Sequence, residues 1–206
     1  MKVLIVFYSR YGNTAKLAEA IAEGARSVSG TEVSLRRVAD LAPEDVIARD
    51  EKWIATREAL AKYPPPTMED LDKADAIVWG TPTRFGNMTA ELKLFLDTTG
   101  GLWVKGKLVN KVTSVFTCNS TAHSGKESTL LSMMIPLLHH GMMIIGVPQT
   151  VPETASAGSY YGATATSGPG NTIGVTEADQ AVARAQGKRM AEVSAALVKG
   201  GLARGV

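Results

Sequence analysis

Hydrophobic and polar positions follow two alternating patterns along the chain. Residues 3–8 form a continuous β-branched and aromatic run, which is typical of a strand covered on both faces of a parallel sheet. Beyond a polar loop, apolar residues recur at helical spacing from Leu17 to Val28, which predicts a helix over about residues 13–28. The first unit is therefore a strand, a short loop and a helix.

The same unit repeats along the rest of the chain. Further strands are predicted at residues 32–38, 76–79, 112–118 and 142–145, and further helices at about residues 88–96, 126–140 and 180–199. Five strands that alternate with helices predict an α/β fold, a doubly wound five-stranded parallel sheet with helices on both faces and right-handed crossovers.

Two connections are longer than this fold requires. Residues 41–73 contain a predicted helix at about 44–61, and the three prolines at 64–66 then break regular structure. Residues 152–175 are rich in Gly, Ser, Thr and Ala. We expect a single domain over residues 1–206, with these two segments as insertions.

Composition narrows the class of protein. Hydrophobic residues make up 45% of the chain and charged residues 20%, as in ordinary globular proteins. The formal net charge is +2 and the basic residues are dispersed, so nucleic acid is not an expected partner. Cys118 is the single cysteine, and residues 3–8 are too short for a signal peptide or a membrane span. We expect a cytoplasmic protein without a membrane span.

The polar loop at residues 9–14, SRYGNT, lies between the first strand and the first helix. Ligands of open α/β sheets bind outside the carboxyl ends of the strands, where such a loop contributes. Ser9, Asn13 and Thr14 supply side-chain donors, and Gly12 permits a tight turn at a helix N-terminus, where partial positive charge favours a dianion. The loop predicts a site for a terminal phosphate.

Other phosphate-binding motifs do not fit. The chain has no GxxxxGK[ST] motif, and no GxGxxG motif follows the first strand. The first and third strands end in Tyr8-Ser9 and Gly80-Thr81, which lack the acidic residues of a receiver-type phosphorylation site. A monophosphate ligand remains. Taken alone, the loop is equally compatible with a turn whose Asn and Thr cap the helix.

A second motif favours the ligand. Residues 80–103, GTPTRFGNMTAELKLFLDTTGGLW, resemble the flavodoxin-like tryptophan-repressor-binding protein (WrbA) family, the type IV NAD(P)H:quinone oxidoreductases. The resemblance continues through HHGM at 139–142 and YGAT at 161–164. It implies FMN as cofactor, NADH or NADPH and quinones as partners, two-electron quinone reduction, and a homotetramer built as a dimer of dimers. FMN is expected instead of FAD, because no motif for a bridging pyrophosphate is present.

The resemblance also implies site residues. Three loops would bind FMN, and His139 would lie near the flavin of an assembled site. The loop residues are Ser9, Arg10, Tyr11, Gly12, Asn13 and Thr14; Thr83, Arg84, Phe85, Gly86 and Asn87; and Cys118, Asn119, Ser120, Thr121 and Ala122. The third loop departs from the family's glycine-rich pattern. Tyr11, Phe85 and Trp103 would form the substrate wall.

The chemistry implied needs little from side chains, because the flavin carries the hydride. No catalytic side chain and no metal are expected, and the adjacent His139 and His140 do not have the spacing of a metal pair. The flavin has room for one planar partner, which predicts a ping-pong mechanism. The alternatives are a flavodoxin-type electron carrier, which usually has a strongly acidic face, and a scaffold protein.

Overall fold

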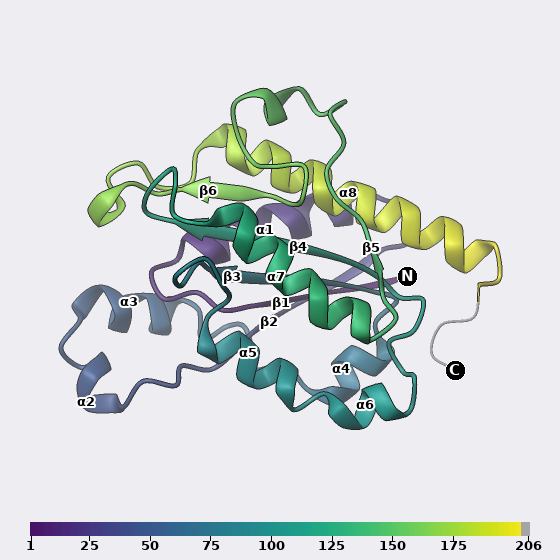
Figure 1. Cartoon of the computed structure of the whole chain (residues 1–206), viewed down its shortest axis with the longest axis horizontal. Coiled ribbons are helices and arrows are strands. Elements are labelled where there is room, and N and C mark those ends of the chain that lie inside the picture. The colour runs from purple at the N-terminus through teal and green to yellow at the C-terminus, as the bar shows by residue number, and fades with distance from the viewer. Residues whose placement is uncertain (203–206) are drawn as a thin grey trace.

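A parallel β-sheet lies between two layers of helices in the computed structural model, which describes residues 1–202 (Figure 1). The strands are β1 (Lys2–Phe7), β2 (Glu32–Arg37), β3 (Ala76–Pro82), β4 (Val112–Asn119), β5 (Met143–Ile144) and β6 (Thr164–Thr166). Their order is β2-β1-β3-β4-β5, with β6 also paired to β4. All pairs are parallel. The predicted doubly wound sheet is confirmed.

Helices cover both faces of this sheet. They are α1 (Asn13–Arg26), α2 (Glu44–Ile47), α3 (Glu51–Ala59), α4 (Met68–Lys73), α5 (Ala90–Asp97), α6 (Gly100–Val104), α7 (Lys126–His139) and α8 (Glu177–Lys199), with 3₁₀ turns η1 (Pro152–Ala155) and η2 (Pro169–Asn171). Side chains of α1 and α8 pack into one core cluster, and those of α4, α5 and α7 into the other. Successive strand residues alternate between the two clusters, as the pleat requires.

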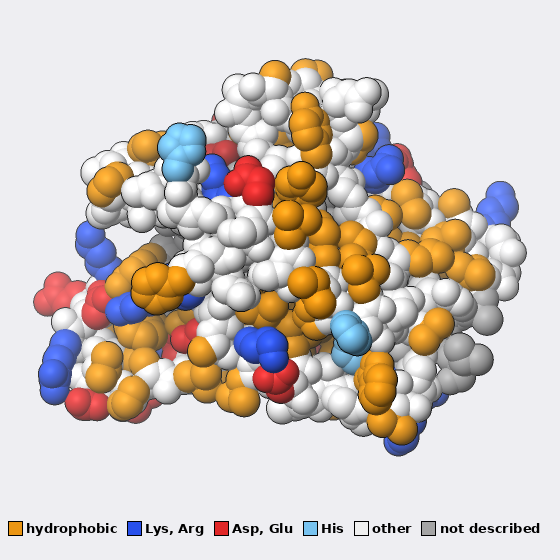
Figure 2. All heavy atoms as spheres, viewed as in Figure 1, with side chains coloured by type: hydrophobic (Ala, Val, Ile, Leu, Met, Phe, Trp, Pro, Cys, Tyr) orange, Lys and Arg blue, Asp and Glu red, His pale blue; other side chains and the backbone are white. Residues whose placement is uncertain are grey.

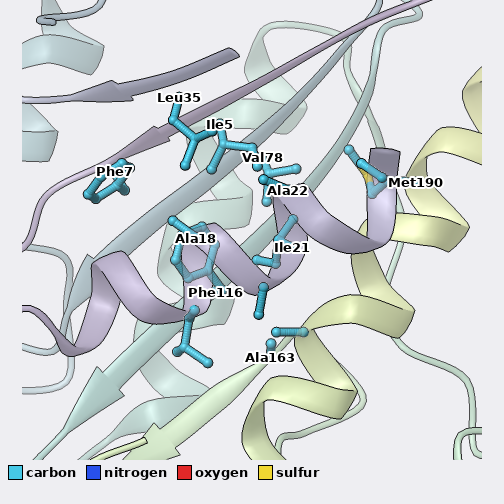
Figure 3. Close-up of a cluster of buried hydrophobic side chains, with 14 of the residues drawn as sticks. Ile5, Phe7, Ala18, Ile21, Ala22, Leu35, Val78, Phe116, Ala163 and Met190 are labelled. Atoms are coloured by element: carbon cyan, nitrogen blue, oxygen red, sulfur yellow. The ribbon is translucent and has the colours of Figure 1, made fainter. Parts of the chain in front are cut away.

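The first core cluster shows how closely α1 and α8 approach each other. Figure 3 shows Ile5, Phe7, Val78 and Phe116 of the sheet together with Ala18, Ile21 and Ala22 of α1 and Met190 of α8. A Cβ at Gly187 would lie 2.0 Å from the carbonyl oxygen of Ile21, and one at Gly24 would lie 1.9 Å from that of Arg184. Glycine is therefore required at both positions of this crossing.

The fifth position of the sheet is divided between two short strands. β5 pairs with β4 at Val112 and Thr113, whereas β6 pairs with it at residues 117–119. Buried Gln186 of α8 bridges β4 and the residue before β6, because its side chain accepts from the Ala163 N–H and donates to the Val115 carbonyl. The sequence predicted a strand at 142–145 and only an insertion at 152–175, so β6 was missed.

The other insertion also differs from its prediction. The prediction of a single helix at 44–61 is wrong, because a new helix, α3, begins after Asp50. The Asp50 carboxylate accepts from the Trp53 N–H as the N-cap of α3. The short helices α4 and α6 were not predicted. The start of α8 at Glu177, not at residue 180, follows from a capping box between Thr176 and Asp179.

Candidate cofactor-binding site

The loop after β1 is shaped as an anion site. Gly12 has φ +88° at the N-cap of α1, a conformation that favours glycine. The Ser9 hydroxyl accepts from the N–H groups of Gly12 and Ala15, at 3.1 and 3.3 Å. No described residue accepts from the N–H groups of Asn13 and Thr14. These two donors at the positive end of α1 are therefore available to a phosphate.

The loop after β3 holds an aromatic side chain out to solvent. Arg84 and Asn87 exchange two backbone hydrogen bonds of 2.8 and 2.9 Å. Between them Phe85 has φ +51° and Gly86 φ +75°, the pattern of a type I′ turn. Phe85 is fully exposed, at 106%. An exposed aromatic residue on a left-handed backbone is unusual, and it provides an apolar surface at the mouth of the site.

The loop after β4 completes the third side. The Thr83 N–H donates to the Cys118 carbonyl at 2.9 Å, which fixes the second loop to the third. Cys118 is buried with its Sγ 3.0 Å from Thr14 Oγ1. Burial raises the pKa of Cys118 to about 11, so the thiol stays protonated and is a weak nucleophile at neutral pH.

The three loops enclose a cavity of about 370 Å³ at the carboxyl ends of β1, β3 and β4. Its lining comprises Ser9, Arg10, Tyr11, Asn13, Thr14, Pro82, Thr83, Arg84, Phe85, Cys118, Asn119, Ser120, Ser124 and Ser167. Among these described residues, Arg10 and Arg84 are the charged ones. The cavity therefore combines hydroxyl and amide groups with positive charge, which suits a phosphorylated and partly apolar ligand.

Several buried polar atoms of residues that line this cavity lack a hydrogen-bond partner, and FMN could supply one. The side-chain oxygen and nitrogen of Asn119 are both buried without a partner, as is the side-chain oxygen of Asn13. Buried polar atoms are normally hydrogen-bonded, so these atoms point to a ligand. A flavin offers both donors and acceptors on its pyrimidine ring for an amide, and its phosphate suits the open N–H groups of Asn13 and Thr14.

The structure also gathers residues that the sequence did not assign. Pro82, Ser124 and Ser167 line the cavity, and Asn171 accepts from the Asn13 side chain at 2.8 Å. Ser124 lies two residues beyond the third loop that the sequence predicted. Ser167 and Asn171 follow β6, and that strand had to be recognised before their place at a strand end could be inferred.

Several predicted residues lie outside the cavity lining. Gly12, Gly86, Asn87, Thr121 and Ala122 belong to the three loops without lining the cavity. Trp103 and His139 instead border a second hollow of about 520 Å³ between α5, α6 and α7. The Trp103 indole N–H donates to the His139 carbonyl at 2.8 Å. Within one chain these two residues are not part of the cofactor cavity.

The fold and this cavity together define a flavodoxin-like protein that binds FMN. The family model described as "NADPH-dependent FMN reductase" matches residues 1–156. The chain belongs to this family.

Curated relatives match almost the entire chain. A protein of Aromatoleum aromaticum named "NAD(P)H dehydrogenase (quinone)" is 48% identical over 205 residues, which cover 97% of this chain and 99% of that protein. A protein of the same name from Archaeoglobus fulgidus is 45% identical over 193 residues, covering 94% of this chain and 97% of that protein.

Solved structures agree with the fold. A flavodoxin, WrbA-like protein from Agrobacterium tumefaciens has a TM-score of 0.65 and 26% identity, covering 95% of this chain and 98% of that chain. A flavodoxin from the domain Archaea has a TM-score of 0.61 and covers 95% of this chain and 99% of that chain, although at 18% identity it supports the fold alone. The expected WrbA-type family and FMN cofactor are confirmed.

Two further observations apply to the described part of the chain. None of its helices combines the length and apolarity that crossing a membrane requires. Residues 1–202 contain no group of three or more His, Cys, Asp and Glu side chains arranged to hold a metal ion.

Proposed function

We propose that this chain reduces quinones to hydroquinones with electrons from NADH or NADPH, by a ping-pong mechanism at the cavity between the three loops. The enzyme class predicted from the sequence is confirmed by the curated relatives, which share the name NAD(P)H dehydrogenase (quinone). The observation that carries the proposal is the cavity itself, with its phosphate-binding end at α1 and its exposed aromatic rim.

FMN, when bound, would supply the two-electron chemistry that links oxidation of the nicotinamide to reduction of the quinone. The open N–H groups at the start of α1 would hold its phosphate. Arg84 is exposed and its guanidinium donates to the neighbouring Thr83 carbonyl, so its charge is available to offset negative charge in the cavity. Tyr11 and Phe85 would provide apolar surface for the planar ring of a nicotinamide or quinone.

The proposed ping-pong order rests on a surface that both substrates would share. Loops after β1, β3 and β4 enclose the cavity, and the aromatic rim of Tyr11 and Phe85 borders its opening. Hydride transfer requires the reacting atoms to lie roughly 3–3.5 Å apart. Tyr11 and Phe85 would offer the same aromatic surface to the nicotinamide and to the quinone, so we infer that the nicotinamide leaves before the quinone enters.

Steady-state kinetics tests this order. Double-reciprocal plots against NADPH at several fixed benzoquinone concentrations should give parallel lines. Intersecting lines, with NADP⁺ inhibition that is not competitive against quinone, would demonstrate a ternary complex and a separate quinone site.

Assembly is part of the proposal. Trp103 and His139 lie outside the cavity, so they would reach a flavin in a neighbouring copy of the chain. Figure 2 shows hydrophobic side chains gathered over the region of α6 and α7. This surface includes the exposed residues Trp103, Val104, Leu131, Ile135 and Leu138. Apolar surface of this kind supports the homotetramer that the family resemblance implied. A cytoplasmic location, expected from the cysteine content, belongs to the same proposal.

A flavodoxin-type electron carrier is the competing function. The net charge of +2 does not favour it, because carriers generally use acidic surfaces to reach their partners. A visible spectrum separates the two functions: NADPH alone should bleach the flavin bands under anaerobic conditions, and benzoquinone should restore them. A carrier would not be bleached by NADPH without a partner protein.

A further inference from the structure

Arg10 lies in the loop at residues 9–14, which we call the phosphate loop, and its side chain contacts the insertion between β2 and β3. Its guanidinium carbon lies 3.8 Å from the ring centroid of Trp53 in α3, and 5.0 Å from the ring centroid of Tyr11. One guanidinium nitrogen is 3.5 Å from Asp50 Oδ2. Arginine stacks on aromatic rings through its flat guanidinium group, which lysine cannot reproduce.

A second contact from the same loop reaches the same point of α3. The Tyr11 hydroxyl donates to Asp50 Oδ2 at 2.7 Å, and the other carboxylate oxygen of Asp50 caps the helix through the Trp53 N–H. Two consecutive loop residues, Arg10 and Tyr11, are therefore held by one helix turn of the insertion.

The insertion is itself anchored beneath the loop. Trp53 is 3% exposed, and its indole N–H donates to Asp40 at 3.0 Å. Asp40 also accepts from the Tyr8 hydroxyl and from Arg37. Burial alone would raise the pKa of Asp40, but hydrogen bonds from Arg37 and Trp53 outweigh it and hold that pKa below its usual range. The carboxylate stays ionised and joins α3 to the ends of β1 and β2.

Backbone hydrogen bonds do little to order the loop. Among the described residues, the N–H groups of Arg10 and Tyr11 have no acceptor, and the turn is closed by the Ser9 hydroxyl. The side chains of Arg10 and Tyr11 must therefore supply the remaining constraint. A loop ordered in advance binds its ligand more tightly, because the entropy of ordering is not lost during binding.

We propose that Trp53 is a positioning residue for the cofactor: it acts through Arg10 to hold the phosphate loop in its binding conformation. This inference rests on the proposed placement of the FMN phosphate in that loop. It gives the insertion at 41–73 a role in cofactor retention, although no side chain of α3 lines the cavity.

Trp53→Leu and Trp53→Phe separate stacking from other roles of the indole. Both substitutions lose the hydrogen bond to Asp40, but only Phe keeps an aromatic face under Arg10. Titration of the full-length apoprotein with FMN, followed by flavin fluorescence, should show about tenfold weaker binding for Trp53→Leu and about threefold or less for Trp53→Phe. Circular dichroism establishes that each variant is folded.

A double-mutant cycle identifies Arg10 as the link. Trp53→Leu should weaken FMN binding in the natural chain but add no further loss in an Arg10→Met background. Additive losses, or equal losses in Trp53→Leu and Trp53→Phe, would overturn the proposal. Arg57→Met is the matched control, because Arg57 lies on the same helix but pairs with Glu44; it should leave FMN affinity unchanged.

Arg10→Lys keeps the test decisive even if Trp53→Leu does not fold. Lysine retains the charge and loses the planar stack, so its FMN affinity should fall clearly below that of the natural chain. Natural affinity in Arg10→Lys would refute a stacking role. Thr14→Ala distinguishes this failure from a misplaced phosphate: if Thr14→Ala weakens binding while the Arg10 and Trp53 variants do not, the placement stands and the positioning role is wrong.

Discussion

The Thr14 hydroxyl has a weak hydrogen-bond partner in this structure. Its Oγ1 lies 3.0 Å from the Cys118 Sγ, and sulfur is a poor hydrogen-bond partner. A phosphate oxygen in the cavity would be a stronger acceptor. We expect Thr14→Ala to weaken FMN binding by about 1.5–3 kcal/mol, roughly ten- to a hundredfold in the dissociation constant, as measured by flavin fluorescence. Thr150→Ala, in an exposed loop, is the control.

Ser9 differs from Thr14 because its hydroxyl already closes the turn through Gly12 and Ala15. Ser9→Ala is therefore expected to lower thermal stability as well as FMN affinity, whereas Thr14→Ala should affect mainly affinity. Unchanged affinity in both variants would mean that the phosphate binds elsewhere.

His140 links stability to pH. The Thr99 hydroxyl donates to the Leu96 carbonyl at 2.6 Å, so it accepts from the His140 Nε2–H at 2.8 Å. The remaining ring nitrogen, Nδ1, is buried without a partner, and burial lowers the pKa of His140. As pH falls below about 6.5, the unfolded chain therefore takes up this proton first. The contribution of His140 to the free energy of unfolding should therefore be fully present above that pH. It should decline below that pH and level off beneath the pKa of His140 in the folded state.

His140→Gln should flatten this decline, because glutamine does not titrate. Melting temperatures at pH 7.5 and 5.5 measure the effect, with His123→Gln in the exposed loop after β4 as the control. If His140→Gln keeps the full difference between the two pH values, another group is responsible for the decline.

The crossing of α1 and α8 depends on the absence of side chains. A Cβ at Gly187 would lie 2.0 Å from the Ile21 carbonyl oxygen, which belongs to helix backbone and cannot turn aside. Alanine favours a helix over glycine by about 1 kcal/mol, yet Gly187→Ala should destabilise the protein by about 1–3 kcal/mol because the helices must separate.

Thermal unfolding measures this effect against a matched substitution. Gly100→Ala, at the start of α6, adds a methyl group where no atom lies within 4 Å, and it should leave the melting temperature unchanged or raise it. A Gly187→Ala protein at least as stable as the natural one would show that the helices adjust without loss.

The complete active site is expected to form only in the assembled protein. Trp103 is 55% exposed on the apolar surface formed with α7. Sedimentation at micromolar concentration should show a homotetramer, and Trp103→Glu should reduce both assembly and quinone reduction, because a buried unpaired charge disfavours an interface. Leu41→Glu replaces an exposed apolar residue outside this surface and should change neither. A monomer with full activity would contradict the assembled site.

Patterns of residues close in sequence were sufficient to predict most of the strands and helices. Strand β1 and helix α1 follow from residues close in sequence, because burial of one face imposes a fixed period on apolar residues. The tight turn before α1 was predictable for the same reason, because Ser9 and Gly12, which shape it, lie close in sequence. The class of cofactor came from these residues together with the family resemblance.

The tertiary structure decided what distant segments do together. Asn13 pairs with Asn171, 158 residues away, and Arg10 with Asp50 and Trp53 of an insertion that the sequence divided incorrectly. β6 has three residues, too few for a period to be recognised, and only its pairing with β4 makes it a strand. Sequence patterns specify which face of an element is buried, not which element covers it. That choice depends on packing and long-range hydrogen bonds, which form only when the whole chain has folded.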